Sequence, residues 1–588
     1  MTVRAMQLIA TIFAALLLLP VLGNASVVEL VGTDFTGGAA SVFGSIQSGE
    51  IDVNYVYAKP TGSRSTMSAK FAVSQPVTGD VVLYVKGRDD DYEKKCEISI
   101  EINGATIFSG PSKFSDARWE TQTYPIGRDV LKTGENEIKI TCLEKEGNLG
   151  RPPWFMVSKV AIAEEGHVFK RNILKDFWFN IPTQIREYPE PLPAGKKPGF
   201  ALRGTKGWLW TPEQYLAEIP VMAKYKMNFL MNCYGSMCDI ENYSWGNPEV
   251  NRWWEDLPAS KKAAYENIVR QCEKNGIAFC FSMNPNLFSK RPLQYDSMAD
   301  IDQLWKHFAW MQGLGVKWFN ISLDDISQGI DASGQAKVVN EIFKRLRAND
   351  PSAQMIFTPT AYWGDGTDAE ARPYLEILAK ELDKDVYLFW TGNSVVGNIN
   401  RQAAVSFKAI SKHRLFLWDN YPVNDAHPTL HLGPVINRDP DLCEVIDGYM
   451  GNPLYTQNEA NRIPLLTCAD YAYNPYNYDP ERSIQQAIVH LESAPEKRDL
   501  LRELVEVYPG FIILGKPNTG LNPVRENFSR LVALKHSRSI LEGYIRYLED
   551  LSARMGKAFP DKYKAAQKTL ADDVAVIKVM ARDRYSAE

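Results

Sequence analysis

Alternating apolar and polar residues in the N-terminal part of the chain predict a β-sheet domain. Three isoleucines alternate with polar residues over 98–102, and residues 136–142 repeat this period of two. The pair Asn103-Gly104 follows the first segment and favours a tight hairpin, because both turn residues readily take positive φ. The pattern over residues 26–170 is therefore typical of a β-sandwich.

From residue 199 the pattern changes to short apolar runs separated by stretches of helical length. Thr211-Pro212 favours a helix start, because proline at the first helical position loses no hydrogen bond. Eight runs of this kind in about 250 residues predict a (β/α)8 TIM barrel over residues 199–485. The eight predicted strands are 200–202, 228–231, 277–281, 316–323, 355–357, 386–390, 414–418 and 445–450.

Two further segments lie before and after the predicted barrel. A proline-rich linker is predicted over 171–198, and residues 486–588 carry apolar residues at helical spacing, which predicts a helical domain. One of its predicted helices covers 528–551 as a single element.

The first 25 residues have the features of a signal peptide. Arg4 precedes an apolar run over residues 8–19, Pro20 ends the run, and Gly23 to Ala25 offer small residues for cleavage. The run is short for a bilayer span, although an uncleaved anchor is the alternative. We therefore expect a secreted or periplasmic protein with no membrane association after cleavage.

Composition narrows the function classes. Of 588 residues, 45% are hydrophobic and 23% are charged, which is too apolar for a disordered chain. The net charge of −5 argues against nucleic acid as a partner. There is neither a C-x-x-C pair nor an H-E-x-x-H motif, so no metal site is expected.

Two features of the β-domain carry separate expectations. Cys96 and Cys142 lie in strand-like segments and are candidates for a disulfide if the protein is exported. The acidic run 89–91 lacks the spacing of a calcium loop, and we interpret it as a solvated turn.

The chemistry of a barrel enzyme collects at the carboxyl ends of its strands. The fourth predicted strand ends in Asp324-Asp325, and strand alternation directs Asn320, Ser322 and Asp324 into the barrel. Two neighbouring carboxylates at this position favour the retention of one proton, which a general acid needs.

Other strand ends add aromatic rings and amides. Tyr362, Trp390, Trp418, Asn420 and Asn452 all stand at or just after predicted strands. Rings beside hydrogen-bonding amides are typical of a site for a pyranose sugar.

These strand-end motifs together resemble the family 84 glycoside hydrolases, the β-N-acetylglucosaminidases that include O-GlcNAcase. The resemblance covers about residues 199–485, and the long motif around Trp418 is specific. The β-domain segment 119–142 resembles galactose-binding-like sandwiches, with glycan binding left open. The barrel motifs that carry the resemblance are 323–326, 359–362, 390–392, 417–425, 432–434, 451–453 and 469–471.

The resemblance implies a retaining mechanism in which the acetamido oxygen of the substrate is the nucleophile and an oxazoline forms. Asp324 would orient and polarise the acetamido N–H, and Asp325 would be general acid and then general base. Tyr362 would position the acetamido oxygen, and no cofactor is required.

The resemblance also implies a set of substrate-binding residues. Thr391 and Val395 would line the N-acetyl pocket with Trp418, and the motif glycine after the first strand is Gly207. The acetamide or the ring hydroxyls would be held by Asn420, Asp425 and Asn452.

Two segments depart from the family pattern. Lys206 stands where the motif of the first strand has Glu, and Met237 stands where the family has a sugar-contacting Lys. The sequence thus predicts an exo-acting β-N-acetylhexosaminidase of N-acetylhexosamine-containing glycans. A glycan-binding protein without normal turnover and an endo-acting hyaluronidase-type hydrolase are the alternatives.

Overall fold

The computed structural model describes residues 26–586 with internal gaps, so the predicted signal peptide lies outside it. The chain divides into two compact units, of which the first comprises residues 1–177, 527–547 and 578–588, and the second comprises 178–526 and 548–577. The gaps are 42–52, 74–75, 78–79, 91–93, 116–118, 128, 149–151, 166–168, 170–184, 208–209, 234–250, 327–329, 423–429, 454–457, 511–521 and 534–537.

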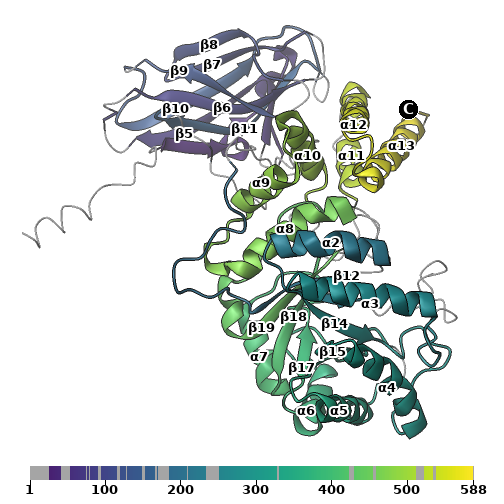
Figure 1. Cartoon of the computed structure of the whole chain (residues 1–588). Coiled ribbons are helices and arrows are strands. Elements are labelled where there is room, and N and C mark those ends of the chain that lie inside the picture. Colours follow the sequence, from purple (N-terminus) through teal and green to yellow (C-terminus); the bar gives the residue numbers. More distant parts are fainter. Residues whose placement is uncertain are drawn as a thin grey trace, which may run out of the picture. The chain divides into compact units, whose positions relative to one another are not determined.

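Two antiparallel sheets form the N-terminal β-domain (Figure 1). One sheet has the order β3-β4-β11-β6-β9 with β1 added beside β11, and the other has the order β2-β5-β10-β7-β8. Buried apolar residues from both sheets form one core, as expected of a sandwich. The strands are β1 (Ser26–Val31), β2 (Thr36–Gly37), β3 (Ala39–Ser41), β4 (Val53–Tyr57), β5 (Thr66–Val73), β6 (Val82–Asp89), β7 (Glu97–Ile102), β8 (Ala105–Pro111), β9 (Glu120–Pro125), β10 (Gly134–Cys142) and β11 (Trp154–Ala163).

The predicted hairpin is confirmed. Strands β7 and β8 pair antiparallel around Asn103 and Gly104, whose φ values are 52° and 82°. Asn103 also donates from its side-chain amide to Asn136 Oδ1 at 2.7 Å, which ties the turn to β10.

The prediction of a solvated acidic turn is wrong for Asp89 and Asp90, which are both fully buried. Asp90 Oδ2 accepts a 2.9 Å hydrogen bond from the backbone N–H of Trp154, and Asp89 accepts one from that of Cys96. These carboxylates therefore satisfy buried backbone donors at the end of β6, a structural role that charge pattern alone does not reveal. Asp91 lies outside the described residues.

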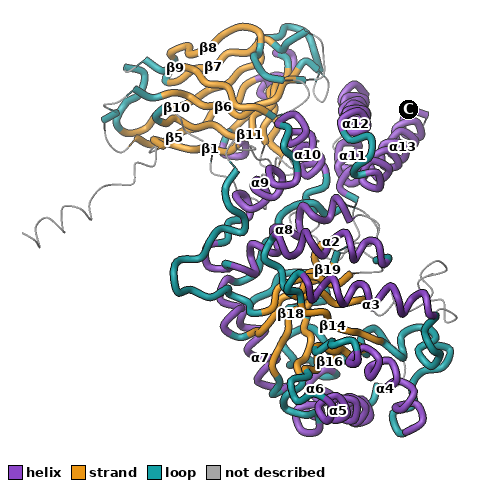
Figure 2. The backbone as a smooth tube through the Cα atoms, in the orientation of Figure 1, coloured by secondary structure: helices purple, strands orange, loops and turns teal. Residues whose placement is uncertain are grey.

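The predicted TIM barrel is confirmed in the second unit, where eight parallel strands close in sequence order (Figures 1 and 2). Seven of the eight predicted apolar runs coincide with strands of the barrel, whereas the first, 200–202, meets its strand only at Leu202. The strands are β12 (Leu202–Gly207), β13 (Phe229–Asn232), β14 (Ala278–Met283), β15 (Trp318–Ser322), β16 (Gln354–Thr358), β17 (Tyr387–Trp390), β18 (Arg414–Pro422) and β19 (Ile446–Asn452).

Helices follow the barrel strands and cover the outside of the barrel (Figure 2). The first begins as predicted, with Thr211 as N-cap and a reciprocal pair of hydrogen bonds between Thr211 and Gln214. The barrel helices are α2 (Pro212–Lys224), α3 (Ala259–Lys274), α4 (Met298–Gly313), α5 (Ala332–Asn349), α6 (Ala371–Glu381), α7 (Arg401–Ser411) and α8 (Asn458–Tyr473).

The C-terminal region is helical, as predicted. The predicted helix over 528–551 falls on α11, described to Ala533, and on α12, described from Arg538, with 534–537 outside the described residues. The helices after the barrel are α9 (Pro480–Leu491), α10 (Pro495–Val507), α11 (Pro523–Ala533), α12 (Arg538–Ala558) and α13 (Lys564–Ser586).

The barrel interior contains a polar layer at the level of Asn320. Ser282 Oγ donates to Asn320 Oδ1 at 2.6 Å, and Asn320 Nδ2 donates to Thr358 Oγ1 at 3.0 Å. Phe319 instead faces outward, with its ring 5.9 Å from that of Phe308 on α4. The alternation predicted for β15 is thus present, and it directs Asp324 inward.

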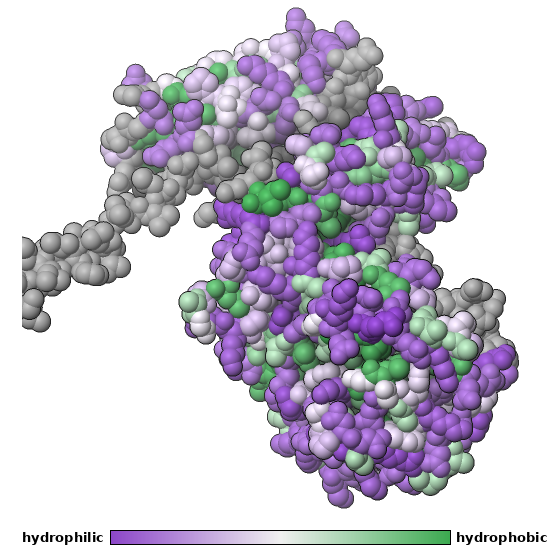
Figure 3. Space-filling model, in the orientation of Figure 1, coloured by the Kyte–Doolittle hydropathy of each residue, from purple (hydrophilic) through white to green (hydrophobic). Residues whose placement is uncertain are grey.

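Hydrophilic side chains cover most of the described surface on the face shown in Figure 3. Over the part of the chain that is described, no helix combines the length and the apolar character needed to cross a bilayer.

Candidate active site

The two carboxylates predicted from β15 lie at the carboxyl end of that strand, but in different environments. Asp324 is buried, with 5% of its surface exposed, whereas Asp325 is exposed. Asp325 has a φ of 56°, an uncommon value for a residue other than glycine. The chain turns sharply here, which allows consecutive side chains to serve one site.

Burial is the main influence on the acidity of Asp324. Desolvation first, and repulsion by Asp325 second, raise the pKa of Asp324 to about 7. The positive charge of Lys206 acts in the opposite direction and lowers the pKa of Asp324. The pair therefore retains a proton over the range in which an isolated aspartate is fully ionised.

Lys206 is the buried cation of this site. It stands one residue before the end of β12, is fully buried, and has its Nζ 3.7 Å from the centre of the Trp418 ring. A cation over an indole face gains a favourable interaction with the ring quadrupole, which partly offsets the cost of burial. Lys206 thus supplies a positive charge beside the predicted catalytic carboxylates.

Tyr362 contacts the exposed carboxylate directly. Its hydroxyl donates to Asp325 Oδ1 at 2.7 Å, and the ring is buried. Asn284, just after β14, donates from Nδ2 to Asp324 Oδ1 at 3.3 Å. Each carboxylate therefore has a neutral hydrogen-bond donor from a neighbouring strand end.

A second wall of the site consists of an aromatic ring and amides. Trp418 Nε1 and Asn452 Nδ2 both donate to Asn420 Oδ1, each at 2.9 Å. Asn420 Nδ2 donates in turn to the carbonyl of Val395 at 2.8 Å. The structure thus brings four of the sequence-predicted binding residues into one hydrogen-bonded cluster.

One acceptor in this cluster has no hydrogen bond. Asn452 is buried, with 3% of its surface exposed, and its Oδ1 accepts no hydrogen bond from the described residues. A buried acceptor without a partner carries a free-energy cost, which a ligand with an N–H or O–H group would relieve.

The other predicted binding residues are placed differently. Thr391 is buried, and its backbone N–H donates to the carbonyl of Tyr362 at 2.9 Å. At Gly207 a side chain would meet the Tyr215 ring at 2.2 Å, so a packing requirement already accounts for glycine there. Asp425 and Met237 lie outside the described residues.

Sequence reasoning missed the direct contribution of Lys206 and Asn284. At Lys206 the sequence shows only a departure from the family motif, and at Asn284 it gives no prediction. The position of each residue at a strand end, inside one predicted barrel, was the signal that could have identified both.

A buried ion pair supports the strand that carries Trp418 and Asn420. Arg438 donates to both oxygens of Asp419, from Nε at 2.9 Å and from Nη2 at 2.5 Å. Tyr449 on β19 donates to the same carboxylate at 2.7 Å. This network fixes the carboxyl end of β18, where Trp418 and Asn420 begin the wall of indole and amide groups that we call the amide wall.

The arrangement has the parts needed for general acid–base chemistry on a neutral polar ring. It combines a buried carboxyl group, an exposed carboxyl group held by Tyr362, and a wall of amides and indole. Among the described residues, no group of three or more acidic, His or Cys side chains could hold a metal ion.

Comparison with known proteins gives consistent results. A family model described as β-N-acetylglucosaminidase matches residues 203–506, which is more than half of the chain. An O-GlcNAc hydrolase mutant from Thermobaculum terrenum has 21% identity and a TM-score of 0.52, covering 65% of this chain and 83% of its own. The protein CpGH84B has 19% identity and a TM-score of 0.52, covering 84% of this chain and 76% of its own. At these identities the solved structures establish likeness of fold.

Proposed function

Because the chain belongs to the β-N-acetylglucosaminidase family of glycoside hydrolases, we propose that it is a retaining exo-β-N-acetylhexosaminidase that uses the substrate's acetamido group as nucleophile. The family implies substrates that contain N-acetylglucosamine. Beyond family membership, we propose the retaining mechanism, the exo mode of action and the role of each residue.

The observation that carries the proposal is the pairing of Asp324 and Asp325 in contrasting environments. A pair that holds one proton can keep the buried Asp324 as an anion while the exposed Asp325 gives up a proton in one step and takes one back in the next. The 2.7 Å contact from Tyr362 to Asp325 adds a donor where the acetamido oxygen would lie.

In the first step the acetamido oxygen attacks the anomeric carbon while the glycosidic C–O bond breaks. Asp324, as carboxylate, accepts a hydrogen bond from the acetamido N–H and stabilises the positive charge that develops in the oxazoline. Asp325 donates its proton to the departing oxygen of the aglycone.

In the second step water opens the oxazoline. Asp325, now a carboxylate, accepts a proton from water as the water oxygen bonds to the anomeric carbon. Two displacements at the same carbon leave the β configuration unchanged, which differs from the usual scheme with an enzyme carboxylate as nucleophile.

The amide wall supports sugar binding in this scheme. Trp418 packs against Lys206 and holds Asn420 through its indole N–H, and Asn452 Oδ1 offers an acceptor with no hydrogen-bond partner among the described residues. A ring hydroxyl or an acetamido N–H satisfies that acceptor, and its removal is expected to weaken binding of the correct sugar.

The experiment that tests the mechanism compares aryl N-acetyl-β-glucosaminides with none, one, two or three fluorines on the acetyl group. Fluorine withdraws electrons from the acetamido oxygen and makes it a weaker nucleophile. We therefore expect kcat to fall by at least about tenfold with the second fluorine and again with the third. A rate independent of fluorination, or formation of the α product by NMR, contradicts the proposal.

A glycan-binding protein without turnover is the alternative that the departures from the family motif support. The contact of Tyr362 with Asp325 and the raised pKa of Asp324 favour the hydrolase, because a binding protein has no need of a shared proton.

We also propose that the protein is exported, because residues 1–25 have the features of a signal peptide. Its substrates would then lie outside the cytoplasm.

A further inference from the structure

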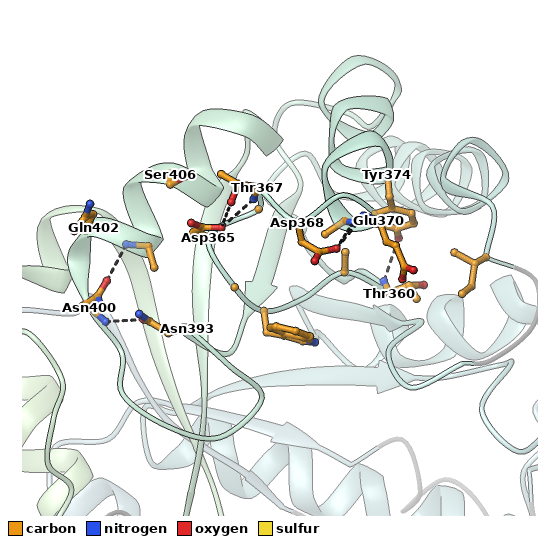
Figure 4. Close-up of a pocket in the computed structure, with 17 residues that line it drawn as sticks. Thr360, Asp365, Thr367, Asp368, Glu370, Tyr374, Asn393, Asn400, Gln402 and Ser406 are labelled. Atoms are coloured by element: carbon orange, nitrogen blue, oxygen red, sulfur yellow. Dashed lines mark hydrogen bonds between the residues drawn. The ribbon is translucent and has the colours of Figure 1, made fainter. Parts of the chain in front are cut away.

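A pocket of about 830 Å³ opens beside the candidate active site, within the size range of ligand sites. We call it the acidic pocket, because its lining includes Asp365, Asp368 and Glu370 together with Trp363, Asn393 and Gln402. Most of its residues come from the loops after β16 and β17 and from the first two turns of α6 and α7, and Ile330 comes from the segment before α5 (Figure 4).

The acidic pocket is built on the same strand ends as the catalytic pair. Thr360, which lines it, donates from Oγ1 to the carbonyl of Leu323 at 3.0 Å, immediately before Asp324. Ala361 and Trp363 also line it, and they flank Tyr362, whose hydroxyl bonds Asp325. The pocket therefore adjoins the loop whose Tyr362 contacts the proposed general acid, Asp325.

Hydrogen bonds between the two loops hold this shared wall in place. Gly364 N–H donates to the carbonyl of Gly392 at 2.9 Å, and Trp390 Nε1 donates to the carbonyl of Gly364 at 2.8 Å. A wall fixed in this way offers a preformed surface to a ligand.

Trp363 provides an aromatic surface in the pocket. Its side chain is 46% exposed, which is unusual for tryptophan in a folded domain. Such a ring can pack against the apolar face of a sugar, while Asn393 and Gln402 provide donors and acceptors for hydroxyl groups.

The described lining of the pocket carries negative charge. None of the described lining residues is Lys or Arg, and the hydrogen bonds from Thr367 lower the pKa of Asp365 and keep it ionised. The nearest arginines on the two helices are engaged elsewhere, since Arg372 pairs with Glu376 and Arg401 lies near Asp441.

We propose that the acidic pocket is an aglycone subsite that accepts a neutral or amino-bearing sugar unit and rejects a uronate. This inference rests on the proposed function, and it specifies the substrate class of the same site. It disfavours a hyaluronan-type polymer, whose aglycone unit is an anionic glucuronate.

The test uses three disaccharides with the same β-1,4-linked N-acetylglucosamine and an aglycone of N-acetylglucosamine, glucosamine or glucuronate. We expect kcat/KM for the glucosamine compound to exceed that for the glucuronate compound by about fivefold or more, since three exposed carboxylates each contribute a small repulsion. Equal values, or faster cleavage of the glucuronate compound, overturn the inference.

Variants then assign the effect to the pocket. In D365N/D368N/E370Q we expect the ratio of glucosamine to glucuronate cleavage to approach one, because each amide can keep the acceptor oxygen while losing the charge. The control is Asp383→Asn, an exposed residue before β17, at the opposite end of the barrel, and it should leave the ratio unchanged. A ratio that both variants change equally contradicts a local effect.

Trp363→Ala tests the stacking surface. We expect kcat/KM for the neutral disaccharide, relative to that for an aryl N-acetyl-β-glucosaminide, to fall about tenfold. An unchanged ratio, or glycopeptides cleaved faster than every disaccharide, overturns the sugar assignment. If the wild type cleaves no β-N-acetylglucosaminide at all, the proposed function fails instead.

Discussion

At the scale of single residues, the site depends on how three charges are arranged. Asp324 is buried beside Asp325, and Lys206 lies close enough to stabilise its anionic form. Lys206 therefore shifts the electrostatic balance of the pair toward the anionic form of Asp324. The balance determines at which pH the pair holds one proton.

Lys206→Met is expected to move the acid limb of the pH profile of kcat/KM upward by about one pH unit. The working form needs Asp324 as an anion, so activity rises with pH through the pKa of Asp324, and loss of the cation raises that pKa further. The measurement is kcat/KM for an aryl N-acetyl-β-glucosaminide between pH 4 and 9. Lys224→Met, an exposed lysine on α2, should leave the profile unchanged, and an unmoved acid limb in Lys206→Met would refute the role of this cation.

Asp324→Asn is expected to stabilise the protein at pH 8 while abolishing most activity. The pKa of Asp324 is raised in the folded state, so the unfolded chain releases this proton first and wild-type stability falls as pH rises from about 4 to 7. The amide removes that penalty, and we expect the Tm difference between variant and wild type to be at least about 2 °C larger at pH 8 than at pH 4. Calorimetry at the two pH values tests the sign, and an equal Tm difference at both contradicts the raised pKa.

At the scale of elements, the carboxyl ends of the strands hold the site residues at fixed positions. Strand β18 contributes Trp418 and Asn420. Asp419 lies between these two residues, and its buried ion pair with Arg438 anchors this part of the strand. The geometry of the amide wall thus depends on an interaction outside the substrate site.

Arg438→Ala is expected to cost about 3–5 kcal/mol of stability, because it leaves the carboxylate of Asp419 buried without its charged partner. Activity should fall with it, through displacement of Trp418. Arg414→Ala is the control at the first residue of β18, the strand that carries Asp419, since its pair with Asp447 is partly exposed and contributes about 1 kcal/mol or less. Chemical denaturation of both variants measures the difference, and equal losses would contradict the anchoring role.

Sequence pattern was sufficient for the elements and for part of the site. The eight apolar runs predicted the barrel because each buried strand lies between helices, and alternation along β15 oriented Asn320 and Asp324 correctly. Pattern did not reveal that Asp89 and Asp90 are buried, because their backbone partners are supplied by distant segments such as Trp154. It also missed Lys206 and Asn284 as neighbours of Asp324, since closure of the barrel brings separate strand ends together.

At the scale of the whole molecule, two compact units combine a β-sandwich with a barrel that contains the candidate site. The first unit holds Cys142 at the end of β10 and Cys96 just before the neighbouring strand β7, and their Sγ atoms lie 3.4 Å apart. This separation is longer than a disulfide bond, and the side chains are positioned to form one under oxidising conditions.

Export would expose this cysteine pair to an oxidant. We expect the protein recovered from an oxidising compartment to have a Cys96–Cys142 disulfide, with two thiol hydrogens lost to the oxidant, and to begin near Ser26. Intact-mass analysis with and without reductant detects both changes. Reduction should lower the stability of the β-domain by about 2–4 kcal/mol, and a protein that retains both free thiols and residues 1–25 would contradict export.

The most direct test of the central claim is hydrolysis of an aryl N-acetyl-β-glucosaminide by the mature protein and by Asp325→Asn side by side. If Asp325 transfers the proton in both steps, the wild type turns over and the variant loses at least about 100-fold in kcat/KM. A wild type that is inactive on both the glucosaminide and the galactosaminide, or a variant that keeps full activity, would contradict the account.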